Sequence, residues 1–397
     1  MKQYLFISTL LISLLFLTNL TKCSVAPGTP VWQIAKQILE QITTKSMKKS
    51  FCCSGDSANG IDDNDANGDG IIILDIPGKY QLTNNITSQI KTTTDNICLN
   101  LNCFTITSTF GTSEMIKIDS LLKNIYICGG ILINTGDPSE GGSGIFVDEN
   151  CSNIQINNVQ ITGCGIGINL NGANTAETKE CFITNCELIE NRKGILMTET
   201  ENSFVQNCHA ISCVTSGFEL VSSTYNKIIS CNATNIANTE DNESSHGFIA
   251  TDGQGNIFQQ CTTKNIQNDG SSGGLASGFT LAGTETDSKI INCLVNTVTS
   301  NPSNTYGFGY LLLGGLVSGI PDATGSIIDC FLMENTACNC DYGFAGYFDE
   351  SMPVKNIGYN NGTNFQTTRI ANVHTYDLSN YPPANDAFVM DNISLAD

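Results

Sequence analysis

Residues 226–248 read NKIISCNATNIANTEDNESSHGF and contain the two marks that recur along this chain. One mark is Cys231, which ends an Asn-x-Ile-x-x-Cys stretch, and the other is the pair Gly247-Phe248. The Gly-Ile or Gly-Phe pairs begin at Gly144, Gly167, Gly194, Gly217, Gly247, Gly278, Gly307 and Gly343; the second marks are Val159, Cys186, Cys208, Cys231, Cys261, Cys293 and Cys330. A repeat of about 22 to 23 residues, lengthened by insertions, predicts stacked coils that share one core.

Both marks are expected to point into the coils. The residues after the glycines, from Phe218 through Phe308 to Phe344, then form an inward aromatic ladder rather than a ligand-stacking surface. Thiols on adjacent rungs lie about 4.8 Å apart and point the same way, which strains a disulfide between them. The ladder cysteines are therefore predicted to be reduced, buried fillers. The pairs Cys52/Cys53 and Cys338/Cys340 lie off the ladder and are better placed for oxidation.

The N-terminus predicts export. Lys2 precedes an apolar run over residues 4–17 and a polar region that ends at Ser24, which is typical of a secretory signal peptide over residues 1–23. Cleavage after Cys23 or Ala26 fits this pattern. Residues 20–23 also resemble a lipobox with Cys23 as the lipidated residue, although Lys22 fits that motif poorly. No other stretch is apolar and long enough to span a bilayer.

The remaining chain divides by pattern into three parts. Residues 24–50 contain Thr29-Pro30 and an apolar face from Val31 to Ile42, which predicts a helix that caps the first coil. Residues 51–350 are assigned to the solenoid, beginning with a polar connector that extends to about residue 75. Residues 351–397 lose the period and are expected to form a C-terminal cap or tail.

Two segments near the start of the coils alternate strongly, as strands do: GKYQLTNNI at residues 78–86 and ICLNLNCFTI at residues 97–106. Together with the Asn-x-Ile/Val-x-x-Cys rungs, they resemble right-handed parallel β-helix proteins of the pectate-lyase-like superfamily over roughly residues 70–350. The resemblance implies an all-β fold, a right-handed parallel β-helix with the capping helix at its start. It does not select an activity, because the superfamily includes polysaccharide lyases, glycoside hydrolases, epimerases, phage tailspikes and non-catalytic surface proteins.

The charge balance excludes one class of partner. The net charge is −20, and Arg192 and Arg369 are the only arginines, so a nucleic-acid partner is not expected. The same scarcity of arginine disfavours a polysaccharide lyase that needs a basic residue beside clustered acids. Arg192 has no acidic cluster next to it in the sequence.

Candidate catalytic residues come from the insertions. From Cys231 onward the segments between each cysteine and the next glycine are long, and insertions at one slot of a solenoid stack on one face. Those loops are expected to contain Asp269, Tyr306, Glu334 and Asp341 as well as the residues around His246. The acids and the imidazole that could gather there to cleave a glycosidic bond are Glu240, Asp241, Glu243, His246 and Asp269. The alternative is that they are solvated loop residues.

Residues 63–70, DNDANGDG, suggest a calcium loop. Asp65, Asn67 and Asp69 alternate before Gly70, as oxygen ligands do in an EF-hand. The closing bidentate acid is missing, because Ile76 stands at the twelfth position. A looser calcium site, or a solvated acidic turn, remains as the expectation.

These observations predict a secreted or cell-surface protein that binds glycans or host surfaces without catalysis, through loops on one face. The alternatives are a carbohydrate-active enzyme, either a polysaccharide lyase or a glycoside hydrolase, and a structural envelope component. A groove in which carboxylates converge with His246 would favour the enzyme.

Overall fold

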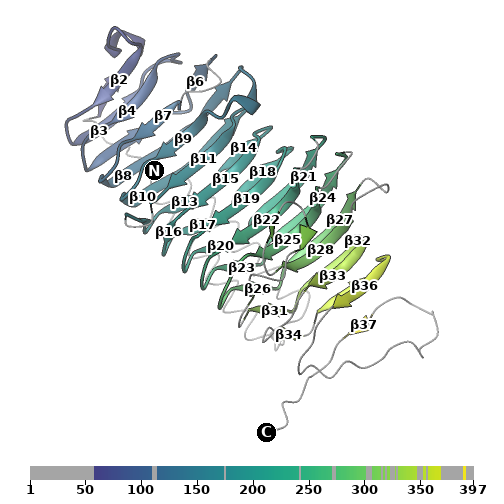
Figure 1. Cartoon of the computed structure of the whole chain (residues 1–397). Coiled ribbons are helices and arrows are strands. Elements are labelled where there is room, and N and C mark those ends of the chain that lie inside the picture. The colour runs from purple at the N-terminus through teal and green to yellow at the C-terminus, as the bar shows by residue number, and fades with distance from the viewer. Residues whose placement is uncertain are drawn as a thin grey trace, which may run out of the picture. The chain divides into compact units, whose positions relative to one another are not determined.

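Parallel strands stack in register, one coil on the next, through the described part of the chain (Figure 1). The structure is a computed structural model, and it describes residues 58–109, 114–173, 176–240, 243–270, 274–300, 306–313, 316–317, 320–321, 327, 330–346, 352–354, 356–367 and 388–389. The predicted signal peptide, with Cys23, and the predicted capping helix lie outside these residues. Within them the only helical turns are the 3-10 elements η1 (Asp63–Asp65) and η2 (Pro138–Glu140). No helix among the described residues is long and apolar enough to cross a membrane.

One wall of the coils is a parallel sheet, here called sheet B. It contains one strand from each coil, and the candidate site lies on its outer side. Its strands are β2 (Ile71–Leu74), β4 (Gln89–Thr92), β7 (Ile116–Ile118), β9 (Ser143–Val147), β11 (Ile166–Asn171), β15 (Lys193–Thr198), β19 (Ser216–Val221), β22 (Ser245–Thr251), β25 (Ala276–Ala282), β28 (Gly307–Leu313), β33 (Tyr342–Gly346) and β36 (Thr363–Thr367).

The other walls form the larger sheet, sheet A, in which two strands of each coil follow one another around a corner. Its strands pair in parallel, except that β37 pairs antiparallel with β35. They are β1 (Asn59–Ile61), β3 (Gly78–Leu82), β5 (Ile97–Asn100), β6 (Thr105–Ser108), β8 (Lys123–Asn134), β10 (Ser152–Thr162), β12 (Thr178–Lys179), β13 (Phe182–Thr184), β14 (Glu187–Ile189), β16 (Thr200–Glu201), β17 (Phe204–Gln206), β18 (His209–Ile211), β20 (Lys227–Ile229), β21 (Asn232–Asn238), β23 (Ile257–Gln259), β24 (Thr262–Asn268), β26 (Lys289–Ile291), β27 (Leu294–Ser300), β31 (Phe331–Met333), β32 (Thr336–Cys340), β34 (Met352–Val354), β35 (Ile357–Tyr359) and β37 (Phe388–Val389). A short antiparallel pair, β29 (Leu316–Val317) and β30 (Ile320–Pro321), stands apart.

The predicted aromatic ladder fills the core behind sheet B. Phe218, Phe248 and Phe279 are fully buried, and successive rings stack with centroids 4.7 Å apart and nearly parallel planes. The rung glycine before each ring lets the next coil approach closely: a Cβ at Gly217 would lie only 2.7 Å from the carbonyl oxygen of Gly247 and would clash with it. The ladder and its glycines therefore form one inward seam, as the repeat predicts.

The prediction for Phe308 was wrong. Tyr310, not Phe308, pairs with Phe279 in the ladder register and stacks on it, and Gly309 takes the rung-glycine position. Phe308 pairs with Ser277 instead, on the outer side of sheet B. The pattern Gly307-Phe308-Gly309-Tyr310 contains two overlapping Gly-aromatic pairs, and only packing against the next coil selects the second.

Cys330 was also misplaced as a ladder mark. The backbone N–H of Cys293 donates to Oδ1 of Asn335, which occupies the next rung of the cysteine column. Cys330 follows Ser288 in a different column, one that begins the neighbouring strand. As a result Glu334 lies at a corner of sheet A, and Asp341 lies in the tight turn between β32 and β33. The prediction that both belong to the long loops was wrong.

The ladder thiols are free, as predicted: Cys186, Cys208, Cys231, Cys261 and Cys293 are buried and unoxidised. The prediction for Cys338/Cys340 was wrong, because both are buried free thiols whose Sγ atoms donate to backbone carbonyls. Cys98 is disulfide-bonded, and Cys52 and Cys53 lie outside the described residues.

The coils extend further at both ends than the sequence pattern indicates. The segment interpreted as a polar connector contains β1 and β2, which pair in parallel with β3 and β4 and so form the first coil. At the other end β34, β35 and β36 continue the ladders of β31, β32 and β33 as far as Thr367.

Candidate functional site

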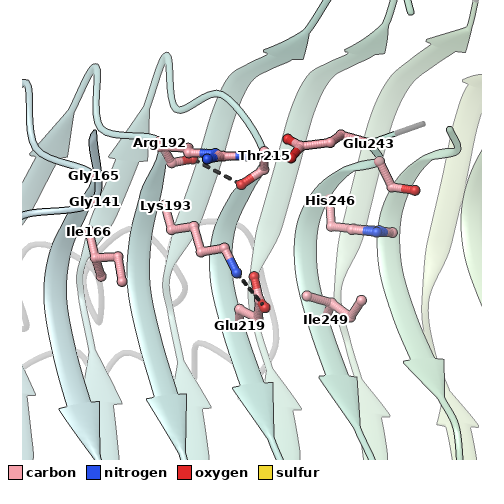
Figure 2. A pocket seen from close by; sticks show the side chains of 11 residues that line it. Gly141, Gly165, Ile166, Arg192, Lys193, Thr215, Glu219, Glu243, His246 and Ile249 are labelled. Carbon is pink, nitrogen blue, oxygen red and sulfur yellow. Dashed lines mark hydrogen bonds and ion pairs between the residues drawn. The ribbon is translucent and has the colours of Figure 1, made fainter. Parts of the chain in front are cut away.

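A pocket of about 440 Å³ opens on the outer side of sheet B, over strands β11, β15, β19 and β22. Its polar lining comprises Arg192, Lys193, Thr215, Glu219, Glu243, Ser244 and His246, all but Ser244 labelled in Figure 2. These residues reach the pocket in two ways. Lys193, Glu219 and His246 lie on strands, with side chains on the outer face, whereas Glu243 comes from the loop that joins β21 to β22. The first of the long insertions therefore supplies one wall.

Arg192 holds that loop against an earlier coil. Its guanidinium pairs with Oε1 of Glu243 and lies 3.8 Å from Oε2 of Glu240. The loop thus crosses the coil that carries Thr215 to reach a residue two coils earlier, and Figure 2 shows Arg192 extending toward Glu243. The side chains of Arg192 and Glu243 are about a third exposed and that of Glu240 is 56% exposed, so each contact is worth about 0.5 kcal/mol or less and sets geometry more than stability. Arg192 has no acidic cluster next to it in the sequence, but the fold brings two acids to it from a distant insertion.

A second ion pair forms the floor of the pocket. Nζ of Lys193 donates to Oε1 of Glu219 over 2.8 Å, and Oγ of Ser216 donates to Oε2 of the same carboxylate over 2.8 Å. Lys193 and Ser216 are register partners on β15 and β19. The side chains of Lys193 and Glu219 are 29% and 18% exposed, so this ion pair remains accessible to a ligand.

Like Thr215, His246 is a buried polar residue of the pocket. Its Nδ1 lies 2.6 Å from Oγ of Ser277 on β25, and Oγ of Ser277 lies 2.5 Å from Oγ1 of Thr280. Burial lowers the pKa of the imidazole to about 4; nearby Glu219 opposes the shift and Lys193 adds to it. The ring is therefore neutral at pH 7, and it is tied to a hydroxyl chain rather than to an acid.

The pocket is balanced in charge and has spare hydrogen-bonding capacity. Arg192 and Lys193 match Glu243 and Glu219, and His246 adds no charge. Oε2 of Glu243 is buried and has no hydrogen-bond donor among the described residues. A buried carboxylate oxygen without a donor costs free energy.

The structure brings two of the five predicted catalytic residues, Glu243 and His246, into the lining of the pocket, and Glu240 lies beside them, 3.8 Å from Arg192. Asp269 does not line it; its Oδ2 accepts from Nε2 of Gln267 on the surface. Asp241 lies outside the described residues.

The sequence interpretation missed Lys193 and Glu219 and discounted Arg192. One signal in the sequence could have found Lys193: it stands directly before a rung glycine, and so do other residues on the outer face of sheet B. These residues pair strand by strand on the outer face, and the row, here called the outer row, consists of Ile166, Lys193, Ser216, His246, Ser277, Phe308 and Tyr342.

The predicted calcium residues make local contacts. Oδ2 of Asp65 accepts from the backbone N–H of Asp62 and closes the capping box of η1, while Oδ1 of Asn67 accepts from the N–H groups of Asp69 and Ile71. Among the described residues no three His, Cys, Asp or Glu side chains are grouped to hold a metal ion. Calcium at Asp65, Asn67 and Asp69 stays a prediction.

We expect His246 to make stability fall with acidification. Its pKa is about 4 when folded and 6.5 for the free group, so between these values the unfolded chain binds the proton and the folded chain does not. The contribution of the neutral His246 to the free energy of unfolding is fully present above pH 6.5 and is lost as pH falls toward 4. The loss amounts to about 2 kcal/mol between pH 7 and pH 4.5. Urea unfolding at both pH values measures this loss. His246→Gln should remove it, whereas His209→Gln, at an exposed position, should retain it; equal pH dependence in all three proteins would contradict the assignment.

Comparisons with known proteins agree with this architecture. Residues 124–295 match the family described as "Right handed beta helix region". Solved structures that resemble the chain include the periplasmic alginate epimerase AlgG (TM-score 0.48, 11% identity, 81% of this chain and 74% of that chain), and a mannuronic acid-specific family 6 polysaccharide lyase from human gut microbiota (0.47, 12%, 82% and 82%). Another is PfbA, a surface adhesin of Streptococcus pneumoniae (0.40, 11%, 75% and 80%).

These likenesses are too distant to carry an activity across to this chain. In sequence, no curated protein matches it. The family match and the parallel ladders nevertheless agree on the architecture: the described part of the chain folds as a right-handed parallel β-helix.

Proposed function

We propose that the pocket binds a neutral glycan. The observation that carries this proposal is Glu243: one carboxylate oxygen is paired with Arg192, and the other is buried at the pocket without a donor. Rotation of the Glu243 carboxylate turns this oxygen toward the pocket, where a sugar hydroxyl can donate to it and accept from Lys193 or Arg192. Concave sites with a few convergent polar groups are the usual form of a small-ligand site.

Charge selects a neutral ligand over an acidic one. Both cations that line the pocket already have a carboxylate partner, so an incoming uronate would have to displace Glu219 or Glu243. The chain as a whole carries a net charge of −20, which repels polyanions at long range. A neutral polyhydroxyl ligand meets neither cost.

Binding fits the pocket better than catalysis does. A glycosidase needs one carboxylic acid that holds a proton beside a second carboxylate. Here Glu219 and Glu243 each contact a cation, and His246 contacts a hydroxyl group. On this proposal the N-terminal segment exports the protein, and the pocket is displayed outside the cytoplasm toward glycans of a cell surface.

Isothermal titration with neutral and acidic oligosaccharides tests the proposal. We expect neutral oligosaccharides to bind and Glu243→Ala to weaken their Kd about tenfold, the value of one hydrogen bond to a charged group. Glu187→Ala, an exposed glutamate on β14, should leave Kd unchanged. A preference for acidic oligosaccharides would contradict the proposal.

Product assays on the same samples separate binding from turnover. New reducing ends or unsaturated products that disappear in Glu219→Gln or Glu243→Gln would replace the proposal with an enzymatic function. Turnover that survives alanine at Glu240, Asp241 and Asp269 would remove those three from the catalytic candidates.

A further inference from the structure

Three aromatic side chains gather on the outer side of sheet B, toward its C-terminal end. Phe308 on β28 and Tyr342 on β33 stack with ring centroids 5.3 Å apart and planes 20° from parallel. Tyr306, just before β28, meets both rings edge-on, at 6.4 Å from Phe308 and 5.1 Å from Tyr342. These three residues are here called the aromatic platform.

The platform is held by the coils and not by a free loop. Oδ2 of Asp341 accepts from the backbone N–H of Gly307 over 2.8 Å, and so fixes the residue between Tyr306 and Phe308. The carbonyl oxygen of Asp341 accepts from the N–H of Thr363 on the next coil. Rings that are already ordered lose little conformational freedom when a ligand binds.

The size of the platform favours a small ligand over a protein. Tyr306 is 57% exposed, and the other two rings are half-buried. A fully buried aromatic side chain covers about 150–250 Å². Three partly covered rings therefore offer well under the roughly 800 Å² that each partner contributes to a stable protein interface. A sugar ring needs less area, and its C–H face packs on an aromatic ring while its hydroxyls reach the tyrosine OH groups and solvent.

The platform continues the outer row of the pocket. His246 pairs with Ser277, Ser277 pairs with Phe308, and Phe308 pairs with Tyr342. Two rungs separate His246 from Phe308, a distance of about 10 Å at the usual strand spacing. Ser277 is fully buried between them, so the pocket and the platform are two separate contacts along one face.

Resting on the proposed function, we propose that the aromatic platform is a second carbohydrate contact, at which a sugar ring of the same glycan stacks on Tyr306. A glycan that occupies the pocket and extends across the strands toward the C-terminal coils then gains affinity with length.

Titration calorimetry with maltohexaose, cellohexaose, laminarihexaose and mannohexaose, and with the matching disaccharides, tests this. We expect a hexasaccharide to bind more tightly than its disaccharide, and Tyr306→Ala to weaken the hexasaccharide about tenfold, as aromatic stacking does for other ring ligands. Tyr306→Phe should retain most of the affinity. Tyr225→Ala removes a tyrosine of similar exposure, 48%, from a turn elsewhere and should have no effect.

The two proposals fail separately. If hexasaccharide affinity is lost in Glu243→Ala but unchanged in Tyr306→Ala, the proposal that a sugar stacks on the aromatic platform is overturned, and the proposal that the pocket binds a glycan is supported. The reverse pattern supports the platform and overturns the pocket. If no hexasaccharide binds the wild-type chain, both are overturned. Self-association in sedimentation that disappears in Tyr306→Ala, with sugar binding unchanged, would assign the platform to a second copy of this chain and overturn the inference.

Discussion

Phe248→Ala should cost about 4 kcal/mol of unfolding free energy, in the range measured for deleting a buried aromatic ring. The ring is fully buried, stacks at 4.7 Å on both Phe218 and Phe279, and meets Phe258 edge-on at 5.7 Å. Removing it leaves a cavity whose walls are ladder rungs, and these cannot collapse without breaking interstrand hydrogen bonds. Urea unfolding followed by circular dichroism measures the loss.

Two further variants separate this effect from a general loss of aromatic surface. Phe248→Leu fills most of the volume and should cost about 1.5 kcal/mol. Phe182→Ala removes a ring that is 42% exposed on the outer side of sheet A, and should cost about 0.5 kcal/mol or less. Equal losses for Phe182→Ala and Phe248→Ala would show that the inward ladder is not the core.

Gly194→Ala should cost about 3 kcal/mol, although it adds only one methyl group. The new Cβ would lie 2.4 Å from the carbonyl oxygen of Gly217 and 3.1 Å from Cβ of Ala210. The carbonyl oxygen belongs to the next rung, so relief of the clash requires the two coils to separate, and overpacking of this kind is destabilising.

Gly68→Ala is the matched control for this clash. A Cβ at Gly68 would meet no atom within 4 Å, so the unfolding free energy should change by no more than about 0.5 kcal/mol. If Gly194→Ala were as stable as the control, the spacing of the coils could not depend on the rung glycines.

The solenoid could be predicted from the sequence because each inward position repeats the same packing problem. Gly217-Phe218, Gly247-Phe248 and Gly278-Phe279 each pair a glycine required by the next coil with a ring that stacks on its neighbour. The prediction failed at Phe308 and Cys330, where an insertion and two overlapping Gly-aromatic pairs make the register ambiguous. Only pairing with Phe279 and Cys293 decides between the alternatives, and that information is not local.

The pocket could be predicted only in part. The loop after Cys231 and the residues Glu243 and His246 follow from the interval between the two marks. Arg192 lies about fifty residues from Glu243 in the chain, and their contact depends on a loop that crosses an intervening coil. No periodicity encodes such a crossing. Lys193 was within reach, because it precedes a rung glycine as His246 does.

The column of buried thiols has a consequence for how unfolding of this protein can be observed. Burial raises the pKa of Cys208 and that of Cys293 well above the usual value, so neither forms the reactive thiolate while its coil is intact. The coils that carry Cys208, Cys231 and Cys293 therefore each contain a thiol that stays unreactive until the coil opens. A thiol-alkylating reagent added during unfolding, followed by peptide mapping, would measure separately when each of these three coils opens, and so show from which end the stack unfolds.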